Sequence, residues 1–171
     1  MRENFMNRKI LLIDIDKCTG CKVCMEACSI IHDGVFSPTL SRIHIMKVEN
    51  KGLSIPSICE HCETNPPCQA VCPVKAINRD EKSGAVIINL EKCTGCRFCK
   101  WICPWGQETI LIRNKKAYKC DLCNGDPYCV KFCTSKALEF LELNESTKKR
   151  KWELAEKRAR EIVTLEVRKH A

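Results

Sequence analysis

The sequence contains no run of apolar residues that approaches the 18 or so needed to cross a bilayer. Its first residues, MRENFMNRK, include neither an apolar stretch nor a twin-arginine pair, so we see no export signal and expect a cytoplasmic location. Aromatic residues make up only 6% of the chain, and there are only seven glycines and seven prolines. These scarcities exclude an aromatic-rich core and a low-complexity chain. A length of 171 residues suits one compact domain with a tail.

Cysteine, by contrast, is abundant, with 16 residues in 171, which is several times ordinary usage. All sixteen fall in four motifs of two kinds, which alternate along the chain. The first kind occurs at 14–28 (DIDKCTGCKVCMEAC) and 89–103 (NLEKCTGCRFCKWIC), and the second at 59–72 (CEHCETNPPCQAVC) and 120–133 (CDLCNGDPYCVKFC). The chain is therefore an internal repeat organised by its thiols.

The spacing within each motif favours iron–sulfur clusters. The first kind is C-x2-C-x2-C-x3-C, the bacterial ferredoxin run for [4Fe–4S] ligation, whose fourth cysteine ligates a different cluster. Three thiolates spaced three residues apart on a curled loop converge on one cubane, and Gly20 and Gly95 permit such a curl. The second kind, C-x2-C-x5-C-x3-C, follows the same logic with a longer excursion. Four cysteine quartets predict four [4Fe–4S] clusters as the cofactors.

Two other uses of cysteine compete with this interpretation. A disulfide scaffold needs an oxidising compartment and gives no reason for four quartets of nearly equal spacing. Structural zinc also uses C-x2-C knuckles, but it usually pairs two of them over a spacer of a dozen or more residues. Four cysteines within eleven residues, found twice, suit cubanes better. Zinc or a three-iron cluster in one site stays an alternative.

The segments between the motifs predict an α+β fold of small hairpins and helices of one to two turns. The alternation predicts a strand at 10–15, hairpins at 43–55 and 76–90, and matching strands at 110–118 and 137–143 around the last motif. Short helices should begin near the third cysteine of each motif, which is Cys24, Cys68, Cys99 and Cys129. Much of the core would then be inorganic.

The last segment, 144–171, contains no cysteine, glycine or proline and predicts a helix capped by Asn144 or Ser146. The residues at helical spacing on its stripe are Trp152, Ala155, Ala159, Ile162, Val163 and Glu166. This helix could pack on its own domain, dock a partner subunit, or form a disordered or nucleic-acid-binding tail.

The motifs CTGCKVCMEAC, IPSICEHCETNPPCQAVCPVKAI, CTGCRFCKWICPWG and YKCDLCNGDPYCVKFC resemble the iron–sulfur subunits of the DMSO reductase family over roughly residues 8–143. Thr134 departs from the proline usual after the last quartet. The resemblance implies one double ferredoxin-like domain at 1–143, with two halves related by a pseudo-twofold. The outer half would comprise 8–35 and 110–143 and the inner half 53–109, followed by the tail at 144–171.

The resemblance also implies which cysteines share a cluster, and that the four clusters form a linear chain. The first cluster would take Cys18, Cys21, Cys24 and Cys133; the second Cys28, Cys120, Cys123 and Cys129; the third Cys59, Cys62, Cys68 and Cys103; and the fourth Cys72, Cys93, Cys96 and Cys99. Each helix that leaves one cluster would deliver a ligand to the next.

A few further side chains have expected roles. His61 lies between two predicted ligands but is not expected to bind metal, and Met25 and Met46 suit core filling. Trp101 and Trp105 flank Cys103 and are expected to shield a cluster from water. No catalytic constellation, phosphate loop or nucleotide-binding fingerprint is present in the sequence, so no catalytic residue is predicted.

These features predict a non-catalytic redox subunit that passes single electrons between a large catalytic subunit and an external carrier. The resemblance favours a tungsten or molybdenum pterin partner of the tungsten aldehyde oxidoreductase type, a group that includes dearomatising aryl-CoA reductases and belongs to anaerobic metabolism. A formate dehydrogenase, hydrogenase or carbon monoxide dehydrogenase partner is an alternative, as are a free polyferredoxin and, more remotely, a zinc or nucleic-acid module.

The net charge of +8 does not by itself indicate nucleic acid. An oxidised cubane with four thiolates carries about −2, so four would contribute about −8 and balance the side chains.

Overall fold

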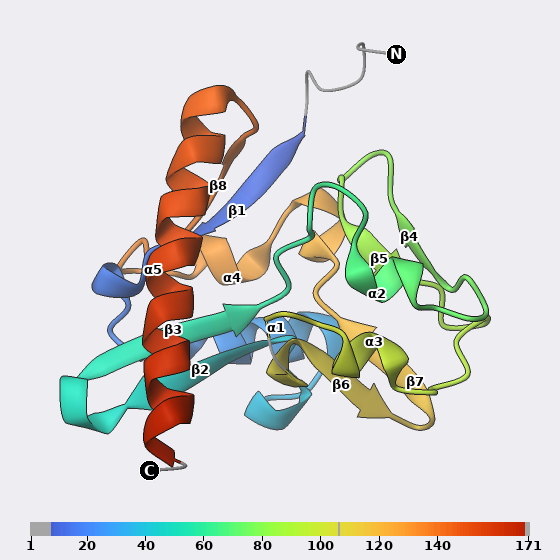
Figure 1. Cartoon of the computed structure of the whole chain (residues 1–171), viewed down its shortest axis with the longest axis horizontal. Coiled ribbons are helices and arrows are strands. Elements are labelled where there is room, and N and C mark those ends of the chain that lie inside the picture. The colour runs from blue at the N-terminus through green and yellow to red at the C-terminus, as the bar shows by residue number, and fades with distance from the viewer. Residues whose placement is uncertain (1–7, 106, 170–171) are drawn as a thin grey trace.

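The computed structural model describes residues 8–105 and 107–169, in which eight short strands pair two by two as antiparallel sheets (Figure 1). Strands β2 and β3, β4 and β5, and β6 and β7 are hairpins, whereas β1 pairs with β8 across almost the whole chain. The strands are β1 (Lys9–Ile13), β2 (Ile43–Val48), β3 (Leu53–Ile58), β4 (Ile77–Arg79), β5 (Val86–Ile88), β6 (Ile110–Arg113), β7 (Lys116–Lys119) and β8 (Leu138–Glu142).

The α-helices are α1 (Val23–Asp33), α2 (Pro67–Ala70), α3 (Phe98–Trp101), α4 (Tyr128–Lys131) and α5 (Glu145–Lys169), and single 3-10 turns lie at 15–17, 38–40, 49–51, 107–109 and 122–125. The mixed small fold with a C-terminal helix matches the expectation. Each of α1 to α4 begins one residue before the third cysteine of its motif, as predicted. Helix α1 is longer than one to two turns, because nothing breaks it before Gly34, whose N–H bonds to the Ile30 carbonyl at 2.9 Å.

The strands agree with the predicted hairpins, but two details differ. The first strand ends at Ile13 because Asp14 turns the chain, with its carboxylate accepting from the Asp16 N–H at 3.2 Å. Segments 110–118 and 137–143 do not pair with each other: the first closes on itself as β6 and β7, and β8 joins β1 with Leu11 opposite Phe140. The β1–β8 pair holds the first motif beside the last.

Two cores surround the cysteines. The first includes Leu11, Ile43 and Leu138 together with cysteines of the first and last motifs. The second places Ile110 and Ala117 of β6 and β7 against Cys93 and Cys99. We expected 110–143 to belong with the outer motifs, but residues 110–119 pack on the inner ones, because their hairpin buries its apolar face there.

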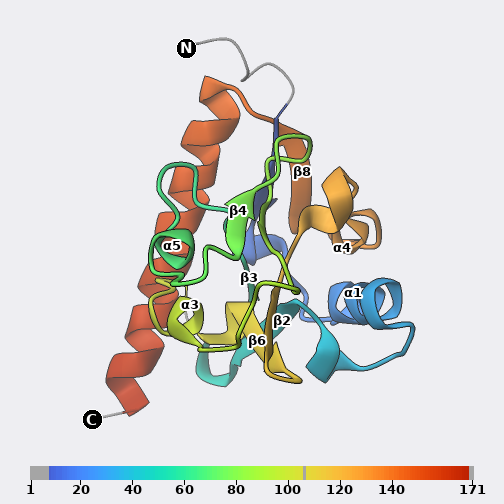
Figure 2. The same ribbon diagram turned by 90° about the vertical axis from the view of Figure 1, so that its right-hand side faces the viewer.

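Helix α5 begins at a reciprocal cap, in which the Thr147 N–H donates to Asn144 Oδ1 and the Asn144 N–H to Thr147 Oγ1, both at 2.9 Å. Of the two predicted caps, Asn144 is therefore the one used. The helix lies along one side of the molecule, with α1 and α4 on the opposite side (Figure 2). No helix in the described ranges is both long and apolar enough to cross a membrane.

The buried face of α5 differs from the predicted stripe. Ala155 is buried and Ile162 packs against the core of Ile15, Val48 and Ile55, but Trp152 is 63% exposed. Val163 and Glu166 lie outside the residues whose side chains the structure describes. Arg158, only 3% exposed, takes the place of an apolar residue and pairs with Glu60, which Lys151 also contacts at 3.3 Å. Tertiary ion pairing therefore overrides the apolar pattern.

Replacing Arg158 by Met should destabilise the protein, because a buried carboxylate would lose one of its two cations. Removing one partner of a buried ion pair lowers the free energy of unfolding by about 3–5 kcal/mol. Because Lys151 still contacts Glu60, we expect a loss near the lower end of this range. Lys157→Met is the matched control, since Lys157 is exposed and pairs with the exposed Asp16. Anaerobic thermal melting of both variants measures the difference, and equal melting temperatures would show that the Glu60 pair contributes nothing.

Candidate metal centres

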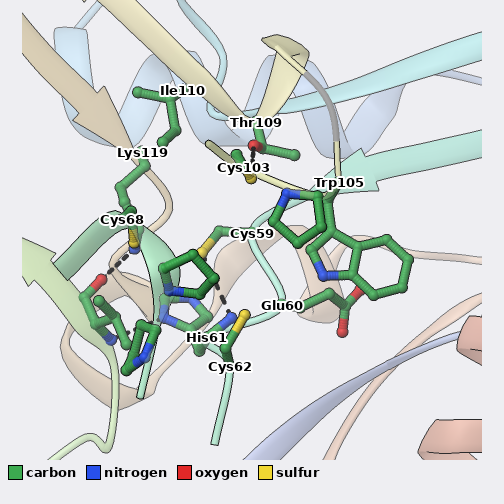
Figure 3. A pocket seen from close by; sticks show the side chains of 14 residues that line it. Cys59, Glu60, His61, Cys62, Cys68, Cys103, Trp105, Thr109, Ile110 and Lys119 are labelled. Atoms are coloured by element: carbon green, nitrogen blue, oxygen red, sulfur yellow. Dashed lines mark hydrogen bonds between the residues drawn. The ribbon is translucent and has the colours of Figure 1, made fainter. Parts of the chain in front are cut away.

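Three pockets among the described residues are each lined by four cysteines, and each quartet draws on two motifs. The first holds Cys18, Cys21, Cys24 and Cys133; another holds Cys59, Cys62, Cys68 and Cys103 (Figure 3); and another holds Cys72, Cys93, Cys96 and Cys99. The fold thus brings together side chains that are far apart in the sequence, such as Cys18 and Cys133.

The remaining four cysteines also lie near one another. Cys28, Cys120 and Cys129 are buried in one core. Burial raises the pKa of Cys129, and the nearby Cys28 and Cys123 raise it further. None of the sixteen cysteines forms a disulfide, and each falls in one of these four groups.

The loops that curl around the thiols use backbone conformations with positive φ. Gly20 and Gly95 have φ of 71° and 70°, as the sequence indicates, and they are followed by Lys22 at 64° and Arg97 at 71°. A left-handed residue just before the helix turns the chain so that the third cysteine faces the first two. The sequence signals the glycines, but neither Lys22 nor Arg97 carries a recognisable signal for this conformation.

Backbone N–H groups donate to many of the sulfurs, and five of these hydrogen bonds have well-defined distances. The donors are Arg42 to Cys28, His61 to Cys59, Ala76 to Cys72, Ala117 to Cys93 and Leu122 to Cys120, all at 3.3 to 3.4 Å. Such donors stabilise negative charge on sulfur without bringing in a side chain, and they tune the potential of a cluster bound there.

The pocket walls otherwise disfavour thiolates. Burial raises the pKa of Cys24 to about 12 and that of Cys68 to about 11, and neighbouring cysteines add to the effect. In the Cys68 pocket the Lys119 ammonium opposes the increase. Four sulfurs in a dry pocket therefore need a multiply charged metal centre to ionise together, and a thiolate-bound cubane fits this donor set.

The second group of cysteines has polar neighbours that the sequence did not single out. His32 Nε2 lies 3.6 Å from Cys123 Sγ and 3.5 Å from Asp121 Oδ1, and Asp121 also pairs with Arg42 at 2.5 Å. Asp121 stands inside a C-x2-C spacing, but His32, on α1, becomes a neighbour only through the fold.

Four residues for which other roles were predicted lie in a core or beside a cysteine pocket. His61 accepts from the Val86 N–H at 2.9 Å through Nδ1, and Met25 is buried as core, with Met46 packed on another core. Trp105 lines the pocket of Cys59 and Cys103, with the Arg158 guanidinium 4.7 Å from its ring.

Trp101 was expected to shield a cluster, and this is wrong. It is 74% exposed, because the four-residue α3 buries Cys99 and leaves Trp101 on the outer side.

Residues 51–143 match the family described as the 4Fe-4S dicluster domain, and the chain belongs to this family. It is 39% identical over 133 residues to the polyferredoxin-like subunit of an aliphatic sulfonate oxidoreductase of Pyrococcus furiosus, covering 78% of this chain and 76% of that protein. It is 34% identical over 165 residues to the electron transport protein HydN of Escherichia coli, covering 82% and 91%.

Among solved structures, it is similar to the active site complex BamBC of benzoyl coenzyme A reductase, with 23% identity, a TM-score of 0.46, and coverage of 82% of this chain and 84% of that one. The family and the sequence relatives identify the chain as an electron-transfer iron–sulfur protein that binds [4Fe–4S] clusters and is not itself catalytic.

A Gly95→Ala variant should hold less iron than the native protein. A Cβ on Gly95 would lie 2.3 Å from the carbonyl oxygen of Lys115, so the β6–β7 turn would be pushed away from the motif. Gly34→Ala is the control, because Gly34 has φ of 69° but nothing within 4 Å of the added atom. The control should cost only the left-handed backbone, roughly 1–2 kcal/mol.

Iron per chain and anaerobic melting of the two glycine variants distinguish these effects. Equal losses would mean that backbone conformation, and not the close approach of Lys115, makes glycine necessary at position 95.

Proposed function

We propose that the chain carries single electrons through four [4Fe–4S] clusters between a large catalytic subunit and an external carrier. The observation that carries this proposal is the grouping of sixteen free cysteines into four quartets that each combine two motifs. When bound, the clusters supply one-electron chemistry, and the chain supplies thiolates, amide donors and dry walls. About sixteen iron and sixteen sulfide per chain are expected, whereas mainly zinc would refute the proposal.

The ligand sets that we propose are the four quartets. Cys18, Cys21, Cys24 and Cys133 hold the first cluster; Cys28, Cys120, Cys123 and Cys129 the second; Cys59, Cys62, Cys68 and Cys103 the third; and Cys72, Cys93, Cys96 and Cys99 the fourth. The proposed order of the clusters is supported where the second meets the third. Cys59 of the third set lies near enough to Cys120 of the second set to raise the pKa of that thiol.

The same sets define two ferredoxin-like halves, which we propose to be related by a pseudo-twofold. The outer half would contain the first and second clusters and the inner half the third and fourth. Because β6 and β7 pack on the inner motifs, the inner half extends to residue 119.

The two exposed cysteines support the proposal that the first and fourth clusters stand at the ends of the linear chain of clusters. Cys21 and Cys96 are the exposed members of the sixteen, and they belong to the first and fourth sets. Electrons would therefore enter and leave at these two ends, because the cysteines of the second and third sets are buried or half-buried.

The end beside Cys96 has the features of a docking surface. Three large apolar side chains of α3 and its end, Phe98, Trp101 and Ile102, are exposed there, and Phe98 lines the same pocket as Cys96. Exposed apolar side chains at helical spacing, next to a proposed redox centre, fit a stable subunit contact. We propose that the catalytic subunit binds this end.

The catalytic partner is proposed to be a tungsten or molybdenum enzyme of the aldehyde oxidoreductase type, with aryl-CoA reductases included. The relative named as a subunit of a sulfonate oxidoreductase supports a dedicated enzyme partner. HydN is named as an electron transport protein without an enzyme, which supports the alternative of a free polyferredoxin. A formate dehydrogenase, hydrogenase or carbon monoxide dehydrogenase partner is the other alternative. The protein that copurifies with the chain and its metal decide between them. Cluster assembly needs reduced thiols, which supports a cytoplasmic site.

Replacing Cys28 by Ser should remove the second cluster and leave the first, because Cys28 and Cys24 share α1 but belong to different sets. Iron should fall by about four atoms per chain, and EPR of the reduced protein should lose one signal. Cys24→Ser is the matched control and should remove a different signal. Loss of the same signal in both variants would refute the crossed ligand sets.

Replacing Trp101 by Ser should weaken binding of the catalytic subunit by roughly 30-fold, since a central exposed tryptophan contributes about 2 kcal/mol to an interface. Trp152→Ser provides the control, because Trp152 is similarly exposed but lies on α5. Affinity for the copurifying subunit, measured by titration, should change in the first variant alone. An equal or larger loss with Trp152→Ser would move the docking surface to α5.

A further inference from the structure

Lys119 is a buried lysine at the end of β7. The strand reads KAYK, and its period of two places Ala117 and Lys119 on the buried face and Lys116 and Tyr118 on the more open one. Lys119 is only 4% exposed and immediately precedes Cys120. A lysine at an inward position is unusual, because burial removes the hydration of its ammonium group.

The ammonium group of Lys119 has hydrogen-bond acceptors but no counter-ion. Its Nζ donates to the carbonyl oxygen of Val86 and to that of Cys120, the latter at 2.9 Å. Among the residues whose side chains the structure describes, 8–105 and 108–162, no carboxylate forms an ion pair with it. Two carbonyl groups accept two of its three hydrogens, but they do not neutralise its charge, and burying an unpaired charge is costly.

The pocket that Lys119 lines is the one with Cys59, Cys62, Cys68 and Cys103 (Figure 3). Lys119 and Cys68 both face this pocket, so the ammonium group lies among the sulfurs that would hold the cluster. The negative charge that the lysine lacks is therefore available from the thiolates of this pocket.

No other charge near this pocket compensates Lys119. Glu60 also lines it, but Arg158 and Lys151 already pair with its carboxylate. Arg79 adds a further cation by donating to the Cys62 carbonyl. The surroundings of this pocket are therefore positive in balance.

Around Cys28 and Cys123, by contrast, each cation has an anion. Arg42 pairs with Asp121, and Arg113 pairs with Asp33 at 2.7 Å. Lys119 lines the pocket of the third site, and its Nζ also donates to the carbonyl oxygen of Cys120, a member of the second set.

We propose that Lys119 is the counter-charge of the cluster held by Cys59, Cys62, Cys68 and Cys103, and that it raises the reduction potential of this cluster. This inference rests on the proposed four-cluster function. A reduced cubane carries one more negative charge than an oxidised one, so a fixed buried cation stabilises the reduced form more. Lys119 is a positioning residue in this role, since it changes the energy of the electron without binding iron.

The test compares two replacements of Lys119 in the full, cluster-loaded chain. Lys119→Gln keeps a hydrogen-bond donor and removes the positive charge, whereas Lys119→Arg keeps both the donor and the positive charge. Lys149→Gln removes the charge of an exposed lysine on α5 and is the matched control. EPR-monitored redox titration gives the midpoint potential of each cluster, and the midpoint missing in Cys68→Ser identifies the third cluster.

Lys119→Gln is expected to lower the equilibrium constant for reduction of the third cluster by roughly tenfold, which corresponds to about 59 mV for one electron. Lys119→Arg and Lys149→Gln should leave this midpoint near the native value. An unchanged midpoint in Lys119→Gln, with all clusters present, overturns the role of Lys119 and leaves the four-cluster function standing.

Iron content decides the remaining outcomes. If Lys119→Gln loses about four iron atoms per chain and Lys119→Arg retains them, the charge is needed to hold the cluster, which supports the proposal. If both variants lose iron equally, the shape of the side chain matters and not its charge, and the proposal fails. A native protein that lacks the cluster sensitive to Cys68→Ser overturns this inference together with the proposed function.

Discussion

The structure depends on one constraint: each short helix supplies cysteines to two sites. The third and fourth cysteines of every motif stand four residues apart, so they are separated by about 6 Å along a helix axis. Cys24 and Cys28 both lie within α1, whereas in α2, α3 and α4 the fourth cysteine lies just beyond the helix end. Neither site of such a pair can shift without moving the other, so the sites form one coupled unit.

This coupling explains how so little regular structure holds a defined fold. A two-stranded sheet is marginally stable on its own, and here every sheet has two strands. The cores are small and include the thiols themselves, so stability comes from what binds the thiols, and from α5. Arg158 and Lys151 fix this helix to Glu60, and Ile162 fixes it to the core of Ile15, Val48 and Ile55.

The cysteine spacing predicts the helix starts, and the alternation predicts the hairpins, because both depend on residues close in sequence. The sequence does not predict what depends on tertiary contacts. The pairing of β1 with β8, the packing of β6 and β7 on the inner motifs, and the outward position of Trp101 are of this kind. Lys119 is the clearest case: it follows the strand predicted at 110–118, and only the fold shows that it is buried and that no described carboxylate pairs with it.

The β1–β8 pair has a consequence for how the protein is made. The cysteines of the third and fourth quartets all lie between residues 59 and 103, so both groups are complete well before synthesis ends. The first and second quartets each join a cysteine from before residue 30 to one after residue 119, and β8 must be present to bring them together. The inner quartets can therefore gather on the nascent chain before residues 120–142, which the first and second quartets need, have been made.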